Sequence, residues 1–230
     1  MSVFSQPKTY SEMLAKIAIF TGVTAFLLTL LIGWHSPAIA STLDALNVDV
    51  KVWVFEKVKV GWVIPAFAIA LISRIIKLHD RLSDAFRIRE NFDLLEILVP
   101  LAGGVQVAVD SAMLSKVRQR RDSAMREMFF KYASSLTPQI DGQLVISALD
   151  KWTWFWILLE SVFVAFVATI VLIVLGGYQA AAFLGLGVLV GILLFRLVGP
   201  VCAPTAHAEV DAILQLPDAP GEIQAYLYKL

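Results

Sequence analysis

Residues 154–198 read WFWILLESVFVAFVATIVLIVLGGYQAAAFLGLGVLVGILLFRLV, and this stretch decides the fold. It contains two apolar runs, Trp154 to Gly176 and Ala180 to Val198, joined at Gly176-Gly177-Tyr178-Gln179. A helix needs about 20 apolar residues to cross roughly 30 Å of hydrocarbon. The Gly-Gly junction is a turn signal too short for anything except an antiparallel hairpin. The stretch therefore predicts two membrane-spanning helices joined at one side of the bilayer.

Two further apolar runs lie earlier in the chain, at Ile17 to Trp34 and Val58 to Ile72. The second is the shortest of the four, and Pro65 should kink it because the ring removes one backbone hydrogen bond. The whole chain of 230 residues is 58% hydrophobic, with a mean hydropathy of +0.75. This leaves too little polar surface for a soluble domain. We expect an all-α integral membrane protein with four transmembrane helices and a cytoplasmic helical insert between the second and third spans.

The charges predict the orientation. Nineteen basic and nineteen acidic residues balance, so no global field indicates nucleic-acid binding. Most of the basic residues, however, fall in the polar insert that follows the second span. Cytoplasmic loops of membrane proteins carry the excess of Lys and Arg. We therefore expect a multi-pass protein of the cell inner membrane, with the insert, the N-terminus and the C-terminus all cytoplasmic.

These assignments divide the chain into four segments. Residues 1–73 hold the first two spans and a short external segment, and residues 74–151 form the cytoplasmic helical domain. The transmembrane hairpin occupies 152–200, and residues 201–230 form short cytoplasmic helices. Helical spacing of apolar residues over 73–88 predicts that the second span continues into the cytoplasm as a stalk. In the last segment, Pro204 to Leu216 and Glu222 to Leu230 are predicted as two helices broken by Pro217 and Pro220.

The N-terminus admits a second interpretation. Lys8 and Lys16, the apolar run, and Ala38-Ile39-Ala40 before Ser41 resemble the three parts of a cleavable secretory signal. Its apolar run of about 17 residues exceeds the usual 7–15 of a signal core, so we expect it to remain as an anchor. A mature chain beginning near Ser41 would instead leave three spans.

The external segment after the first span is also ambiguous. From Leu46 to Val60, apolar residues recur at every second position except Glu56, which is typical of a half-buried strand. The same segment fits one face of a helix through Leu43, Leu46, Val50 and Trp53. Since one strand leaves its backbone unpaired in a helical protein, we favour an amphipathic helix at the membrane interface.

Small residues form stripes on two spans: Ala18, Gly22 and Ala25 on the first, Gly187 and Gly191 on the fourth. In lipid, helices associate where small side chains allow close backbone approach. We expect a neighbouring helix on the first stripe and a homo-oligomer formed partly through the second.

The strongest candidate site pairs Glu160 with Arg196. Each lies 18 residues from Tyr178 at the centre of the hairpin turn, so both sit about 27 Å along their helices. An acid and a base at matched depth are expected to form an ion pair, and Arg74 could complete a triad. Ionisable groups within a membrane are often functional, whereas a structural bridge near the inner interface is the simpler interpretation.

The insert carries a basic run that is a candidate contact for anionic lipid or a phosphorylated ligand; a solvated helix face is the plainer alternative. The run consists of Lys116, Arg118, Arg120, Arg121 and Arg126. His79 with Asp80 and Asp84, and His207 with Asp211, are expected to be surface pairs without the ligands of a metal site. We expect the Cys202 side chain to behave as an ordinary small apolar group.

No phosphate loop or nucleophile motif is present, so the sequence predicts neither an enzyme nor a cofactor. We expect a self-associating protein that couples its cytoplasmic domain to its membrane spans. A sensor, or a pore-forming or membrane-perturbing effector of a bacterial stress or antiviral (phage) defence system, fits this layout, with a cytoplasmic protein as a candidate partner. The main alternative is a non-conducting scaffold or accessory subunit that anchors a soluble protein, and a third, less favoured class is a membrane enzyme acting on lipid.

Overall fold

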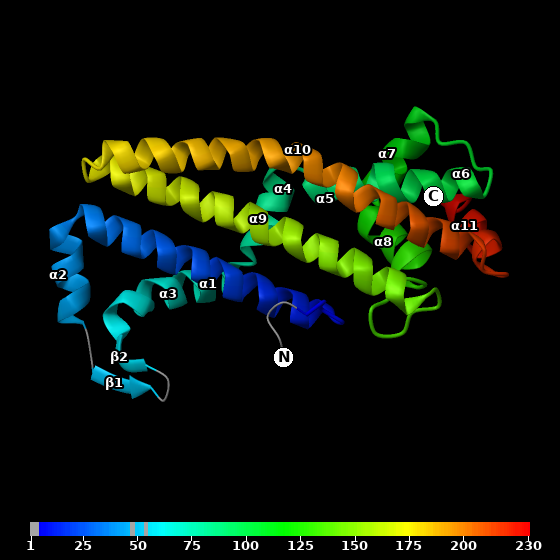
Figure 1. Ribbon diagram of the computed structural model, residues 1–230. Helices are drawn as coiled ribbons and strands as arrows, with labels where there is room; N and C mark the ends of the chain where they lie inside the picture. Colours follow the sequence, from blue (N-terminus) through cyan, green and yellow to red (C-terminus); the bar gives the residue numbers. More distant parts are fainter. Residues whose placement is uncertain (1–4, 47–48, 53–54) are drawn as a thin grey trace. The chain divides into compact units, whose positions relative to one another are not determined.

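The chain forms long helices at both ends and short helices in the middle (Figure 1). The computed structural model describes residues 5–46, 49–52 and 55–230. In chain order the elements are α1 (Tyr10–His35), α2 (Pro37–Ala45), β1 (Asp49–Val52), β2 (Phe55–Lys59), α3 (Val60–Ile76), α4 (Leu78–Ala85), α5 (Ile88–Phe92), the π-helix η1 (Asp93–Leu98), α6 (Val99–Gly104), α7 (Ser111–Gln119), α8 (Arg121–Met125), the π-helix η2 (Arg126–Phe130), α9 (Gly142–Val174), α10 (Tyr178–Leu214) and α11 (Ala219–Leu227).

Among the described residues, α1, α9 and α10 are each long and apolar enough to cross a membrane. A fourth span results if α3 and α4, which are bent by 59° at the break between them, are taken together. The prediction of a mainly helical chain with several apolar helices of spanning length is thus confirmed, with three or up to four such helices.

The chain divides into two compact units. Unit 1 comprises the residues up to Met13, Leu82–Thr153 and Leu197–Leu230, and unit 2 comprises Leu14–Arg81 and Trp154–Arg196. Long helices cross these limits: α9 belongs to unit 1 as far as Thr153 and to unit 2 from Trp154. The four predicted segments therefore do not correspond to the compact units.

Unit 2 is a bundle of apolar helices packed through small residues. Gly191 of α10 lies directly against Val162 of α9, and a Cβ on Gly22 of α1 would lie 3.3 Å from Ala70 of α3. Ala25 of α1 is buried in one cluster with α3 and α9 residues. Close backbone approach at small residues is the expected mode of helix packing in lipid.

The turn between α9 and α10 has the geometry of a glycine-terminated helix. Gly176 adopts φ +77°, and the Gly177 N–H donates to the Leu172 carbonyl at 2.8 Å. Many helices end with a left-handed residue followed by a hydrogen bond from the next N–H to a carbonyl in the last turn of the helix. Glycine adopts the left-handed conformation without a Cβ clash. The antiparallel hairpin predicted from the Gly-Gly junction follows from this local chemistry.

The predicted continuous stalk is wrong. Lys77 and Arg87 both adopt φ 51°, so the helix is interrupted after Ile76 and again after Ala85. A left-handed residue turns the chain out of a right-handed helix. The main bend therefore lies at Lys77, whereas Pro65 lies inside α3 without ending it. Apolar periodicity predicted the helical conformation of this region but gave no signal for the two breaks.

The segment before α3 is a β-hairpin and not the favoured amphipathic helix. β1 and β2 pair antiparallel, with Asp49 opposite Lys59 and Val50 opposite Val58, and the register shifts between Val50 and Val52. The period-two pattern was therefore the correct signal. The segment folds back on itself, so its two strands satisfy each other's backbone groups. The parts of the pattern at 47–48 and 53–54 lie outside the described residues.

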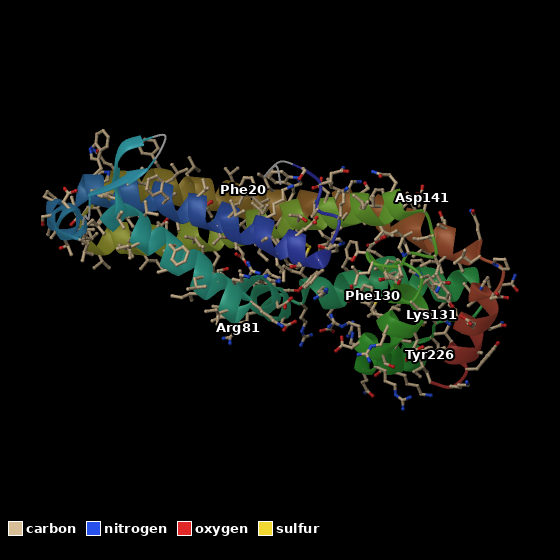
Figure 2. All side chains as sticks on the ribbon, turned by 90° about the horizontal axis from the view of Figure 1, so that it is seen from below. Phe20, Arg81, Phe130, Lys131, Asp141 and Tyr226 are labelled. Atoms are coloured by element: carbon tan, nitrogen blue, oxygen red, sulfur yellow. The ribbon has the colours of Figure 1, made fainter. Side chains whose placement is uncertain are left out.

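Unit 1 has its own apolar core, which joins segments distant in sequence. Leu98 and Leu101 from the middle of the chain pack in one buried cluster with Ile213, Ile223 and Leu227 from its end. Cys202 is a free, buried thiol in the same cluster. Residues 74–151 and 201–230, predicted as separate segments, thus share a core; Figure 2 labels Lys131 and Tyr226 on this unit.

The predicted C-terminal helices are also corrected. The segment from Pro204 is no separate helix, because α10 continues through Pro200 and Pro204 to Leu214. The break falls at Pro217, before α11 begins at Ala219. Pro220 lies in the first turn of α11, where the missing N–H would have no helical partner in any case.

Candidate functional site

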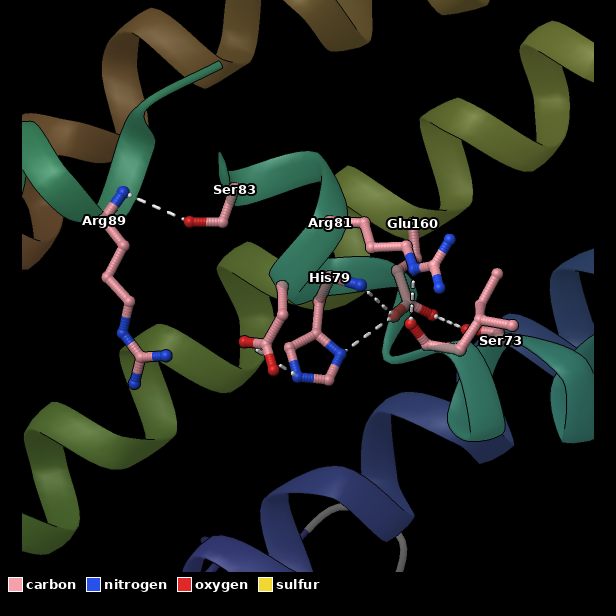
Figure 3. Close-up of polar contacts among 8 residues, drawn as sticks. Ser73, His79, Arg81, Ser83, Arg89 and Glu160 are labelled. Carbon is pink, nitrogen blue, oxygen red and sulfur yellow. Dashed lines mark hydrogen bonds and ion pairs between the residues drawn. The ribbon is translucent and has the colours of Figure 1, made fainter. Parts of the chain in front are cut away.

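A single buried carboxylate links three helical segments of unit 2 to α9. Glu160 is 1% exposed. Its Oε2 accepts hydrogen bonds from the Thr21 hydroxyl of α1 and from the Ser73 hydroxyl of α3, both at 2.7 Å. Its Oε1 accepts the backbone N–H of His79 in α4 at 3.1 Å. We call these four residues, Thr21, Ser73, His79 and Glu160, the Glu160 cluster. Figure 3 labels Ser73, His79 and Glu160.

The backbone bond from His79 follows from the break in the helix. Because Lys77 is left-handed, α4 starts anew at Leu78, and His79 is its second residue. The first N–H groups of a helix have no partner within that helix. Glu160 supplies an acceptor from another helix, and its carboxylate also suits the positive end of the helix dipole. The bend at Lys77 and the buried carboxylate are therefore two parts of one arrangement.

The His79 ring makes a second contact with the same carboxylate. Its Nδ1 lies 3.3 Å from Glu160 Oε1, and the ring packs at 6.0 Å from the ring of Trp156. For the Nδ1 contact to be a hydrogen bond, Nδ1 must carry the proton, since the carboxylate oxygen can only accept. Buried beside a carboxylate, the imidazole is held in one orientation.

The other ring nitrogen is buried without a hydrogen bond. His79 is 5% exposed, and Nε2 has no partner within hydrogen-bond distance among the described residues. The carboxylate of Asp80 is 3.6 Å away, slightly too far for a hydrogen bond. With Nδ1 protonated, Nε2 can be a free acceptor or, in the imidazolium form, a second donor. Nε2 is thus a buried polar atom that the contacts among the described residues leave without a hydrogen bond.

The structure does not bring Arg196 or Arg74 to Glu160. Arg196 is exposed on α10, and Arg74 is exposed in the last turn of α3. Equal spacing from the hairpin turn does not determine which way a side chain points. Position 162 faces α10, where it contacts Gly191, whereas Val164 and Ala168 pack with α1 and α3 residues. Glu160 precedes Val164 by one turn and therefore shares its face.

His79 was expected to form a surface pair with acids of its own helix. Its ring does lie near Asp80, but the surface location is wrong, because His79 is buried. The ring is buried because the 59° bend between α3 and α4 leaves the start of α4 against Glu160 and Trp156 of α9. Ser73 and Thr21 were not singled out from the sequence at all. One signal could have found them: a carboxylate in an apolar segment needs donors, and hydroxyls on neighbouring spans can supply them.

The small-residue stripes have different surroundings. Ala18 and Gly22 lie where α1 approaches α3. Ala25, about one turn further along α1, is buried. On α10, Gly191 is buried against Val162, while Gly187 is exposed and nothing would meet a Cβ added to it. The two glycines therefore do not serve one common contact within the chain.

Two residues of the basic run form ion pairs. Arg118 lies 3.3 Å from Glu90, and Arg121 contacts Asp93 at 3.5 Å and Asp122 at 2.9 Å. Lys116, Arg118, Arg120 and Arg126 are exposed. The structure thus leaves four of the five cations on the surface of unit 1, one of them, Arg118, in an ion pair.

Two further groups of unit 1 carry charge contacts. Burial raises the pKa of Asp93 to about 6, although the charges of Arg89 and Arg121 lower it. His207 contacts Glu96 at 2.9 Å rather than the predicted Asp211. Among the described residues, no group of His, Cys, Asp and Glu has the arrangement of a metal site.

Comparisons with known proteins add one assignment. No curated protein and no solved structure matches the chain. The model of the YmfE protein family covers residues 9–224, which is nearly the whole length. The chain therefore belongs to the YmfE protein family.

Proposed function

We propose that this chain is a multi-pass inner-membrane protein that couples its membrane-spanning helices to the helical unit 1, with the Glu160 cluster as the coupling point. The observation that carries the proposal is the hydrogen bond from the His79 backbone to Glu160. It ties the start of α4 to α9, and α4 continues across the limit between the units at Arg81 and Leu82. A change at the carboxylate would therefore act on a helix that leads directly into unit 1.

The chemistry of the cluster suits a two-state element. Glu160 accepts three hydrogen bonds and one ring contact, and a carboxylate that gains a proton loses acceptor capacity. An additional proton on His79, or a ligand acting on its free Nε2, would alter the same contacts. Switches of this kind work by a local change in charge that biases a movable element. Here that element is α4 with its left-handed junction at Lys77.

Hydrogen–deuterium exchange of the purified protein tests the coupling. Glu160→Gln should increase exchange at the amides of α4 and also of α5, which lies wholly in unit 1. Thr24→Ala is the matched control, because Thr24 bonds Ser161 at 3.1 Å and contributes no hydrogen bond to Glu160. If exchange rises only in α1, α3 and α9, the carboxylate is a structural tie within the bundle and the proposed coupling is wrong.

The orientation is part of the proposal and rests on the asymmetry of Lys and Arg. In a Cys202→Ser background, Leu95→Cys and Arg118→Cys should be protected from an impermeant thiol reagent in intact cells. Asn47→Cys should be labelled. The opposite pattern would place the insert outside and reject the proposed topology.

We also propose that the protein self-associates through the face of α10 that carries Gly187. Around this glycine the structure leaves open space within the chain, and a second backbone could approach there. Gly187→Leu should lower the mass of the detergent-extracted particle, whereas Gly185→Leu, on a residue facing Thr169 of the same chain, serves as the comparison. An unchanged mass for Gly187→Leu would mean that this face contacts lipid.

A further inference from the structure

An open apolar groove runs along unit 2 between α1 and α3, with a volume of about 620 Å³. Its floor is made of small residues from both helices: Ala15, Ala18 and Gly22 of α1 face Ala66 and Ala70 of α3. Small side chains leave the two helices close together with a hollow above their contact line. The volume falls within the roughly 300–1,000 Å³ typical of small-molecule sites.

One end of this groove is charged. Ala66, Ala70 and Arg74 follow one another at intervals of four residues, so they share one face of α3 over two turns. Arg74 is the one charged residue among those that line the groove. Its side chain is exposed, and within the part of the chain that the structure describes its guanidinium has no acidic partner. The groove thus presents an apolar channel that ends at an arginine.

This combination identifies the chemistry of an occupant. An apolar hollow does not hold water well, because water needs several polar partners. Arginine binds phosphate through two parallel hydrogen bonds. A molecule with a long hydrocarbon chain and a phosphate at one end satisfies both parts of the groove. A helix from a second copy would fill the apolar part but would leave the guanidinium without an anion.

We propose that the groove binds one anionic phospholipid, with an acyl chain between α1 and α3 and its phosphate on Arg74. Arg74 directly follows Ser73, which donates to Glu160. A bound headgroup would therefore lie next to the Glu160 cluster in the chain. This inference rests on the membrane localisation proposed above, and it does not depend on the coupling role or on the orientation.

The test is native mass spectrometry of detergent-solubilised protein titrated with phosphatidylglycerol or phosphatidylcholine. The wild type should retain one phosphatidylglycerol more tightly than phosphatidylcholine. Arg74→Gln should weaken phosphatidylglycerol binding about fivefold, the effect of losing one cationic contact of about 1 kcal/mol. It should weaken phosphatidylcholine binding less, because the choline of that lipid already neutralises its phosphate. Lys77→Gln is the matched control, since it removes a nearby exposed charge outside the groove lining.

Filling the groove tests the position of the acyl chain. Ala18→Leu should weaken binding of both lipids, and Ala70→Leu provides a second filling variant should the first fail to fold. An equal loss for Arg74→Gln and Lys77→Gln would reveal general surface attraction and overturn the proposal. Full lipid retention in a folded filling variant would also overturn it. A lipid-free dimer that Ala18→Leu converts to a monomer would overturn it as well, because the occupant of the groove would then be a second copy of the chain. Because the assay is done in detergent on a folded chain, its result is independent of the topology and exchange experiments.

Discussion

At the scale of single residues, the two carboxylate oxygens of the buried Glu160 hold the helices of unit 2 together by accepting hydrogen bonds. Three donors from α1, α3 and α4 converge on one carboxylate. Hydrogen bonds to a charged group are worth about 1.5–3 kcal/mol each, about twice the value for neutral pairs. In an apolar bundle the carboxylate also depends on these donors, because an unpaired buried charge is strongly unfavourable.

Removal of one donor should therefore have a large effect. We expect Ser73→Ala to lower the free energy of unfolding by about 1.5–3 kcal/mol, measured by denaturant titration in detergent. Thr24→Ala breaks a neutral hydroxyl pair of the same bundle and should cost about 0.5–1.5 kcal/mol. Equal losses for the two variants would show that Glu160 is not an ionised acceptor.

Asp93 offers a prediction for pH. Burial raises its pKa from 3.8 to about 6, so the folded state holds its proton more tightly than the unfolded state. Stability linked to this group is therefore fully present below pH 3.8 and is lost as the pH rises through about 6, by at most about 3 kcal/mol. Asp93→Asn should flatten the pH dependence of unfolding between these values. If the wild type instead gained stability relative to Asp93→Asn as the pH rises from 3.8 to about 6, the raised pKa of Asp93 would be wrong.

At the scale of elements, the packing between helices determines how much a side chain added at each glycine would destabilise the fold. Gly191 lies against Val162, whose β-branched side chain has little freedom to move away. We expect Gly191→Leu to separate α9 from α10 and lower the stability by about 1–3 kcal/mol, as overpacking does. Thermal unfolding in detergent measures the effect.

Gly187→Leu is the internal control for that measurement. It adds the same side chain one turn earlier in α10, where nothing lies within 4 Å. Because the loss of self-association proposed above would itself lower the stability, the comparison is made between monomeric particles, in which the midpoint of unfolding of Gly187→Leu should not fall below that of the wild type. Should both substitutions destabilise the chain alike, helix propensity or lipid contact would be responsible instead of the α9 contact.

At the scale of the whole molecule, unit 1 depends on residues from the end of the chain. Ile223 of α11 is buried in the cluster that contains Leu98 and Leu101. Lys131 bonds Glu222 at 2.6 Å, which fixes α11 to the segment after η2. The core of unit 1 is therefore completed by residues about 120 positions after Leu101.

Truncating one buried side chain of α11 should therefore loosen distant parts of the unit. We expect Ile223→Ala to lower the stability by about 2–5 kcal/mol and to increase proteolysis within residues 82–153. Tyr228→Ala, on an exposed neighbour, should leave the cleavage pattern unchanged. Cleavage confined to α11 itself would show that the rest of unit 1 folds without it.

The sequence by itself determined the features that depend on local chemistry and average hydropathy. Apolar runs predicted the long helices, the Gly-Gly junction predicted the hairpin of α9 and α10, and small residues marked the approach of α1 to α3. Each of these follows from a few neighbouring residues, so no distant contact was needed. The period-two pattern also indicated the strands of the β-hairpin. The helix was wrongly favoured there because a single strand would leave its backbone groups unpaired.

Only the tertiary structure decided the site. Glu160 was singled out because a charge in an apolar run is conspicuous, but its partners depend on the rotation of α9 about its axis. That rotation places Val162 on α10 and directs Glu160 toward Thr21, Ser73 and His79, away from Arg196. It results from the sum of many weak packing contacts along the helix, and no single residue encodes it. The bend at Lys77 and the union of the C-terminus with unit 1 are likewise products of long-range packing, which sequence periodicity does not record.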